Sequence, residues 1–241
     1  MFNFWIRRWF RTLPNYFLIL ITLSLLNYFF NEGFTFRMIN RFFYFSQNIN
    51  EIHPSWFFPE AWSLSIEEWF YLIIPLLIFA PSILFKISSK KTLLLTIFGV
   101  IIISTLFRYH RFSLDLIHDI NDCENLLRKQ VITRVDSLMF GLLGAYINFY
   151  YFDKWIKYKK SFLILGISYF LIAKFILPYY INLNSLYFTV FSFTLTSIST
   201  LLLIPFLSNW KKTKSILYKP ITYISLISYS MYLINNSIIQ K

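Results

Sequence analysis

The feature of this sequence that most constrains its fold is a series of long apolar runs that carry few or no charges. They occupy Leu13–Phe30, Trp69–Phe85, Thr92–Phe107, Ser137–Phe152, Ser161–Leu177, Ser185–Leu207 and Ile221–Ile239. A helix that crosses a bilayer needs about 20 mainly apolar residues. The runs therefore predict an all-α fold, a polytopic membrane helix bundle with about seven transmembrane helices.

Composition agrees with this class and excludes several others. Only 14% of the residues are charged, whereas soluble domains carry about 25%. The 53 aromatic residues (29 Phe, 17 Tyr and 7 Trp) suit side chains that pack between helices and at the two lipid interfaces. Cys123 is the single cysteine, so an internal disulfide framework is excluded.

The net charge of +12 is distributed as a topology signal. If the runs cross a membrane, 14 lysines and arginines fall in one set of alternate loops, which begins at the N-terminus. Seven fall in the opposite set, and Arg108 and Arg111 count there as loop residues. The positive-inside rule then places the N-terminus in the cytoplasm. Because the charge is accounted for in this way, we do not expect nucleic-acid binding.

The first motif precedes the first apolar run and reads Arg7-Arg8-Trp9-Phe10-Arg11. Arg8 and Arg11 are three residues apart, so on a helix they share a face and can grip phosphate groups bidentately. The alternative is that they are ordinary anchors at the cytoplasmic entrance of a span. Their spacing alone favours the anchor interpretation.

The second motif, Trp62–Pro75, places Glu67 and Glu68 at the outer mouth of an apolar run. Carboxylates at such a boundary are costly and are usually kept for function, here as acid/base groups. The alternative is a solvated helix N-terminus with Ser63 or Ser65 as its cap. The spacing does not decide between the two.

The third motif runs from Arg134 and Asp136 to Gly141, Gly144 and Ala145. The small residues form a face that permits close helix packing. We expect Arg134 and Asp136 to pair with each other, or Arg134 with Glu67. A structural role is the favoured interpretation of this segment.

The fourth motif lies in the last run, where Tyr229 and Tyr232 are three residues apart. With Asn235 or Asn236 they can line a polar pocket between helices. Buried amides also serve as plain hydrogen-bonding contacts between helices, and that alternative stays open.

A metal site is conceivable near His118, with Asp115, Asp119, Asp122 and Cys123 as its neighbours. The spacing matches no strong ligand signature. We expect a solvated acidic surface there, and no metal.

Together the four motifs, in this order, resemble the membrane-bound acyltransferase-3 family over Phe4 to Asn235. The resemblance implies a ten-helix domain in the bacterial inner membrane that moves an acyl group, usually acetyl from acetyl-CoA, to a hydroxyl. Typical acceptors would be sugars of lipopolysaccharide O-antigen, exopolysaccharide or other envelope glycans. By the same resemblance, Arg8 and Arg11 would face the CoA phosphates and Glu67 would belong to the functional core.

The sequence also departs from the family pattern. The family's first two helices, with a catalytic histidine, would precede Met1, and its last helix would follow the tyrosine motif. Asn235 stands where the family usually has a histidine. We therefore expect residues 1–241 to be a single domain with about seven of ten helices. An inactive remnant that acts as a membrane scaffold, or a transporter of a lipid-linked glycan, is the alternative function.

The candidate site residues are sorted by the role that we expect of them. We expect Glu67, Tyr229 and Tyr232 to be catalytic, and we expect Arg8 and Arg11 to bind acyl-CoA. Contacts to the acceptor fall to Trp62, Ser63, Arg134, Asp136 and Asn235. Expected partners are membrane lipids, acyl-CoA and a glycan acceptor; acetyl-CoA is a cosubstrate, and no bound cofactor is expected.

Overall fold

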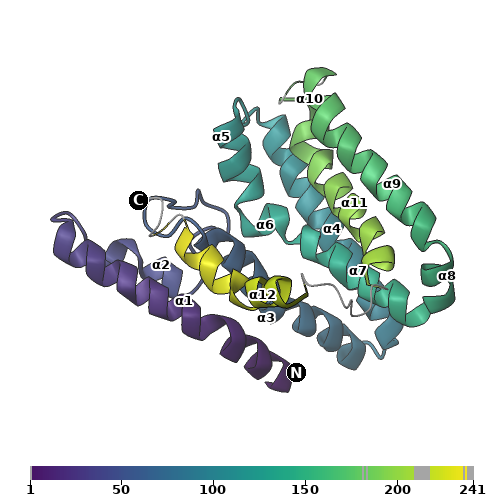
Figure 1. The fold of residues 1–241 in the computed structure, drawn as a ribbon, viewed down its shortest axis with the longest axis horizontal. Helices are drawn as coiled ribbons and strands as arrows, with labels where there is room; N and C mark the ends of the chain where they lie inside the picture. The colour runs from purple at the N-terminus through teal and green to yellow at the C-terminus, as the bar shows by residue number, and fades with distance from the viewer. Residues whose placement is uncertain (1, 181, 183, 209–217, 236, 238–241) are drawn as a thin grey trace. The chain divides into compact units, whose positions relative to one another are not determined.

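The computed structural model describes residues 2–180, 182, 184–208, 218–235 and 237, and within them the chain is helical with no strand (Figure 1). The chain divides into two compact units. Unit 1 comprises Met1–Pro75 with Lys212–Lys241, and unit 2 comprises Leu76–Lys211. The long helix α3 (Ala61–Leu84) contributes its first part to unit 1 and its second part to unit 2.

The other helices fall within one unit each. Unit 1 contains α1 (Phe2–Phe30), α2 (Asn40–Phe43) and α12 (Tyr218–Ile234). Unit 2 contains α4 (Ser89–Ser113), α5 (Ile120–Asp122), α6 (Val131–Arg134), α7 (Asp136–Tyr150), α8 (Phe152–Lys157), α9 (Lys159–Leu171), α10 (Leu177–Tyr180) and α11 (Ser192–Leu207). Short π-helical segments, Cys123–Arg128, Ile172–Ile176 and Tyr187–Phe191, join some of them.

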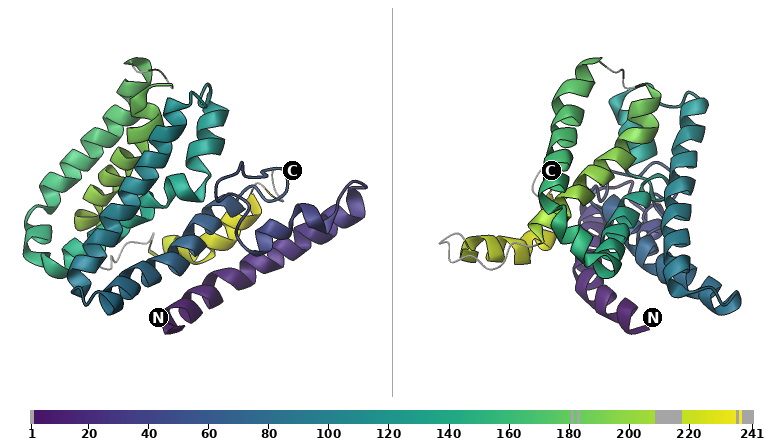
Figure 2. Two further views of the ribbon diagram at one scale, coloured as in Figure 1. Left: turned by 180° about the vertical axis from the view of Figure 1, so that it is seen from behind. Right: turned by 90° about the vertical axis from the view of Figure 1, so that its right-hand side faces the viewer.

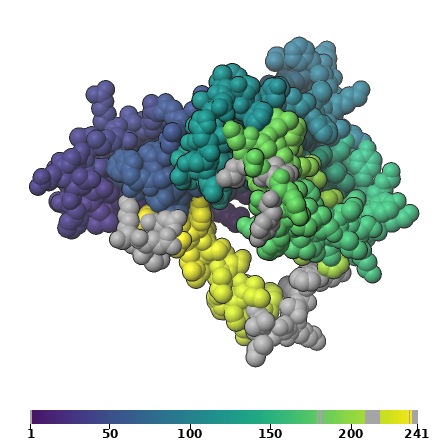
Figure 3. Space-filling model, turned by 90° about the horizontal axis from the view of Figure 1, so that it is seen from above, coloured from purple at the N-terminus to yellow at the C-terminus, as the bar shows by residue number. Residues whose placement is uncertain are grey.

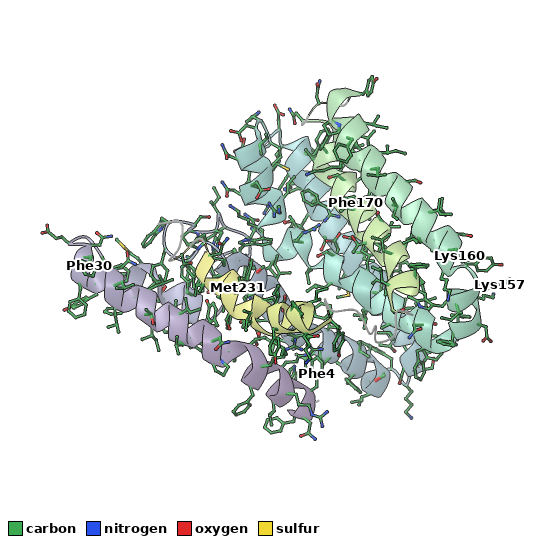
Figure 4. The ribbon with its side chains drawn as sticks, in the orientation of Figure 1. Phe4, Phe30, Lys157, Lys160, Phe170 and Met231 are labelled. Atoms are coloured by element: carbon green, nitrogen blue, oxygen red, sulfur yellow. The ribbon has the colours of Figure 1, made fainter. Side chains whose placement is uncertain are left out.

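The predicted membrane fold class is confirmed. Within the described residues, four helical stretches are long and apolar enough to cross a membrane, namely Phe2–Phe30, Ala61–Leu84, Ser89–Ser113 and Tyr187–Leu207. Phe30, at the end of α1, points outward (Figure 4) and is 85% exposed, and Phe170 of α9 is 47% exposed. Such apolar surface suits lipid rather than water. The chain is a helical membrane protein.

Helix α1 begins well before its apolar run and continues through Pro14. Its buried residues Tyr16, Leu20 and Leu23 recur at helical spacing and form one face. The Tyr16 hydroxyl donates to the Phe42 carbonyl at 2.8 Å, and its ring stacks on Phe58 with centroids 5.4 Å apart. This aromatic core holds α1 against the loop between α2 and α3.

The alternative in which Ser63 or Ser65 caps α3 is excluded. The helix starts at Ala61, so Ser63 and Ser65 lie inside it, where their hydroxyls donate to the carbonyls of Glu60 and Ala61. The buried Gln47 side chain from the preceding loop donates to the Ala61 carbonyl and to the Ser65 hydroxyl. The earlier start places Glu67 and Glu68 inside the helix rather than at its mouth.

In unit 2, α9 and α11 run side by side in both views of Figure 2, and their atoms form a continuous surface in Figure 3. They approach closely at Gly166, whose carbonyl accepts a 2.7 Å hydrogen bond from Ser199. The predicted small face on α7 is only partly right. Gly144 is buried against Leu201 and Trp155, but Gly141 and Ala145 are exposed.

Candidate functional site

The arginine motif and the carboxylate motif lie side by side in unit 1. Helices α1 and α3 run antiparallel, and the Trp5 indole donates to the Tyr71 carbonyl at 2.8 Å. The expectation that the two motifs occupy opposite ends of their membrane spans was wrong. It failed because α1 begins at Phe2, so that its arginines already lie in the helix alongside α3.

Glu68 is the more firmly held of the two adjacent carboxylates. It is 7% exposed. The Trp9 indole donates to one of its oxygens at 3.1 Å, and the Thr12 hydroxyl donates to the other at 3.1 Å. Both donors are neutral, so they fix the orientation of the carboxylate without bringing an opposite charge to it. The family resemblance had assigned the functional role to Glu67 and not to Glu68. Neighbouring helical residues differ by about 100° in direction, so the sequence does not show which of the two faces α1.

Glu67 is partly exposed, and Arg8 and Arg11 both interact with it electrostatically. The Arg8 guanidinium lies 5.0 Å from the centre of the Tyr71 ring and 5.9 Å from that of Phe4. Guanidinium groups are attracted to aromatic faces, so these rings position Arg8. Unit 1 thus combines one fixed carboxylate with one accessible carboxylate beside two arginines.

Two pockets adjoin α1. One, of about 520 Å³, is lined by Asn3, Phe4, Arg7, Arg8 and Arg11. A pocket with three guanidinium groups suits phosphate, which arginine binds bidentately. The other, of about 310 Å³, is mainly apolar and has Trp9 and Glu68 in its wall.

The tyrosines of α12 join the same polar region. The Tyr229 hydroxyl donates to the Thr12 carbonyl at 3.0 Å, and the Thr12 hydroxyl in turn holds Glu68. The Tyr232 and Ser63 hydroxyls are 2.8 Å apart. The structure therefore brings Tyr229 and Tyr232 of α12 close to α1 and to Ser63 of α3, respectively.

The remaining acceptor candidates of unit 1 are Trp62 and Asn235. The Trp62 carbonyl accepts from the Asn48 amide at 3.1 Å, and the Trp62 side chain is partly exposed. Asn235 follows directly after α12 with an exposed side chain, and Asn236 lies outside the described residues.

Unit 2 contains a buried ion pair that the sequence did not reveal. Arg108 and Asp136 are 2.8 Å apart, and both side chains are 0% exposed. Arg108 also donates to the Thr133 carbonyl at 2.6 Å and to the Thr194 hydroxyl at 2.8 Å. The prediction that Arg108 and Arg111 lie in a loop was wrong, since both are buried in α4, which continues to Ser113. The Asp136 carboxylate offsets the cost of burying the Arg108 charge.

Arg134 lies beside this pair but is not its ionic partner. Its guanidinium stands 5.0 Å from the centre of the Phe193 ring. Burial lowers the pKa of Arg134, and the Asp136 carboxylate partly opposes that shift. The expectation that Asp136 pairs with Arg134 was wrong, because Asp136 pairs with Arg108 instead.

The acids near His118 have a local structural role. The Asp119 carboxylate accepts from the Asp122 backbone N–H at 2.7 Å and caps α5, and the Asp122 carboxylate accepts from the His118 backbone N–H at 3.0 Å. Among the residues that the structure describes, no three histidine, cysteine or acidic side chains are grouped so as to hold a metal.

Long apolar helices, with a pocket lined by three arginines near one buried and one partly exposed carboxylate, define an integral membrane protein with a polar site among its helices. The family model for the acyltransferase-3 family, described as an acyltransferase domain, matches residues 1–240. The chain belongs to this family, and its chemistry is acyl transfer. No curated protein and no solved structure matches it.

Proposed function

We propose that the protein transfers an acetyl group from acetyl-CoA to a hydroxyl of a cell-envelope or exported glycan, in the bacterial cytoplasmic membrane. One observation carries the proposal: the arginine pocket of α1 lies beside the Glu67 and Glu68 carboxylates of α3. A phosphate-binding group and a proton acceptor are the two parts that a CoA-dependent transfer to a hydroxyl requires.

Arg8 and Arg11 hold the phosphates of the acyl donor. They lie on one face of α1 and line the same pocket with Arg7. Bidentate contacts from planar guanidinium groups give both affinity and orientation for phosphate. With the N-terminus in the cytoplasm, this pocket faces the compartment that supplies acyl-CoA.

Glu67 accepts or relays the proton of the acceptor hydroxyl. As the O–H bond breaks, the hydroxyl oxygen bonds to the thioester carbonyl carbon, the C–S bond breaks, and the proton finally passes to the CoA thiolate. Glu67 is partly exposed and within electrostatic reach of the donor arginines, which suits contact with substrates.

Other residues position the acceptor. Tyr229, Tyr232 and Ser63 form the hydroxyl-rich region next to Glu68 in unit 1. In unit 1, Trp62 and Asn235 are also assigned to the acceptor. In unit 2, Arg134 and Asp136 are assigned to it separately.

The test is transfer of radiolabel from acetyl-CoA to envelope glycans in membranes of cells that produce the protein. We expect label in the glycan fraction, and a loss of about a hundredfold or more for Glu67→Gln, since a positioned general base contributes that much. Arg8→Ala and Arg11→Ala should raise the KM for acetyl-CoA. Arg37→Ala is the matched control, because Arg37 is an exposed arginine of the same unit outside the pocket.

Two results would overturn the proposal. The first is an absence of glycan label above the level of membranes without the protein, as an inactive scaffold would give. The second is glycan translocation without label transfer, as a transporter would give.

A further inference from the structure

Among the described residues, five buried polar atoms on four side chains of unit 2 have no hydrogen-bond partner and belong to residues that lie close together. They are Arg108 Nε, Gln130 Oε1 and Nε2, Arg134 Nη1 and Asp136 Oδ1. Buried polar groups in native proteins are paired in more than about 90% of cases, with protein or with another molecule. Five orphaned atoms in one place therefore need a common explanation.

Arg108, Gln130, Arg134 and Asp136 form one group around Thr133, which we call the unit 2 polar cluster. Arg108 donates to the Thr133 carbonyl and to Asp136, and the Thr133 hydroxyl donates to the Gln130 carbonyl at 3.4 Å. Arg108 and Arg134 both lie within 6 Å of the Phe193 ring centre, at 5.8 and 5.0 Å. Residues 130–136, α4 and the start of α11 thus meet at one point.

The cluster carries an excess positive charge. The carboxylate of Asp136 is paired with Arg108, so the guanidinium of Arg134 has no carboxylate of its own. The nearby, exposed Arg128 forms an ion pair with Glu124, so among the described residues no ion pair includes Arg134. A buried cation without a counterion is unfavourable, and an anion that binds there relieves the cost.

The unpaired atoms also specify more than an anion. The oxygens of Asp136 and Gln130 need donors, whereas the nitrogens of Arg108, Arg134 and Gln130 need acceptors. A ligand that carries hydroxyl groups and a negative charge satisfies both. Arg108, Gln130 and Asp136 are fully buried and Arg134 is partly exposed, so a ligand would arrive from the Arg134 side.

We propose that the unit 2 polar cluster binds a negatively charged sugar residue, with Arg134 on its carboxylate or phosphate and with Asp136 and Gln130 on its hydroxyls. This inference rests on the proposed function, because the sugar would belong to the glycan acceptor. It narrows that acceptor to the anionic class.

The test measures binding in the absence of any acyl donor. The purified full chain in lipid nanodiscs is unfolded thermally with increasing glucuronate, glucose 6-phosphate, glucose or inorganic phosphate. A ligand that binds only the folded state raises the unfolding midpoint with its concentration. We expect either glucuronate or glucose 6-phosphate to raise the unfolding midpoint. A rise with glucuronate identifies a carboxylate as the anionic group of the sugar, and a rise with glucose 6-phosphate identifies a phosphate.

Variants locate the site. Arg134→Gln should weaken binding by about tenfold or more, since it removes a hydrogen bond to a charged group. Gln130→Leu, which takes away both amide atoms, should weaken binding while leaving the charge unchanged. Arg128→Gln is the matched control, an identical substitution on the exposed surface, and should bind as the parent does.

The proposal is overturned if no sugar shifts the unfolding midpoint, which would mean that the cluster is hydrated by water only. It is also overturned if glucose and glucuronate shift the midpoint equally. The third contrary result is a shift of the midpoint that persists in both Arg134→Gln and Gln130→Leu. Equal effects of inorganic phosphate and glucose 6-phosphate would reduce the cluster to a simple anion site and also overturn it. Label transfer from acetyl-CoA to a neutral glycan is unaffected by these outcomes, so this inference can fail while the proposed function stands.

Discussion

The two units bury a carboxylate in opposite ways. In unit 1, Glu68 is held by the neutral donors Trp9 and Thr12 and stays 7% exposed. In unit 2, Asp136 is paired with the cation Arg108, and neither side chain is exposed. Neutral donors orient a carboxylate without cancelling its charge, whereas a cation cancels it.

The difference in partners determines how each carboxylate can respond to a substrate. A carboxylate that keeps its charge can respond to a proton or cation that arrives with a substrate. A fully buried pair is costly to break, because the partner that remains is a charge without compensation. Charge pairing therefore separates the Glu68 carboxylate, which has neutral partners only, from the Asp136 carboxylate, whose charge is matched by Arg108.

The largest effect that tests this comparison is expected for Asp136→Asn. The change leaves the Arg108 guanidinium buried without its carboxylate, which should cost about 3–5 kcal/mol of unfolding free energy. Thermal or denaturant unfolding in detergent measures it. The control is Glu124→Gln in the exposed Arg128–Glu124 pair, where the loss should not exceed about 1 kcal/mol.

Joint replacement of the pair sharpens the same comparison. Arg108→Met combined with Asp136→Leu should recover much of the lost stability, because apolar side chains of similar volume need no counterion. Similar destabilisation by Asp136→Asn and Glu124→Gln would show that the buried pair does not support unit 2.

The next effect concerns packing in unit 2 without any change of charge. A Cβ at Gly166 would lie 2.9 Å from the Ser199 carbonyl oxygen and 3.2 Å from Leu202 Cβ. Gly166→Ala should therefore destabilise the protein by about 1–3 kcal/mol, as overpacking does. At Gly141 a Cβ meets nothing within 4 Å, so Gly141→Ala should be neutral or stabilising. Equal unfolding midpoints for the two variants would refute the close contact.

A smaller effect is expected where Glu68 meets α1. Thr12→Val removes one of the two side-chain donors to Glu68, which should cost about 1–2 kcal/mol while Trp9 remains in place. Transfer activity should fall more steeply than stability, because the carboxylate loses its orientation. Thr22→Val is the control on the same helix, since the Thr22 hydroxyl is exposed and bonds only the Leu18 carbonyl. Parallel losses of activity in both variants would argue against a positioning role for Thr12.

The smallest expected effect is a change in the rate at which Cys123 is labelled. Cys123 lies in the π-helical segment that precedes the unit 2 polar cluster in the chain. Burial raises the pKa of the Cys123 thiol, with Glu124 adding to the shift and Arg128 opposing it. An ordinary thiol is half ionised near pH 8.5. Maleimide should therefore react more slowly at this pH with the folded chain than with the chain unfolded in detergent, and the folded rate should keep rising above it. A folded rate that levels off by that pH would contradict the burial of Cys123.

Much of the fold was predictable because hydrophobic burial in lipid depends on local sequence. Within the described residues each apolar run falls mainly in helix, and the family resemblance was correct because its motifs are local strings. The ends of the helices were less predictable. The predicted runs stop at charged residues, whereas in the structure tertiary contacts allow the helices to continue through such residues. Arg108 was placed in a loop for this reason, and the arginines of α1 were placed outside their helix.

What the sequence by itself determined is the helical membrane class, the acyltransferase family and the residue types available for chemistry, because these follow from composition and short motifs. Only the tertiary structure decided which of Glu67 and Glu68 is fixed by α1, that Arg8 lies over Tyr71, and that Asp136 pairs with Arg108. Those contacts join residues far apart in the chain. They depend on the rotation and register of whole helices, which hydrophobic periodicity leaves open.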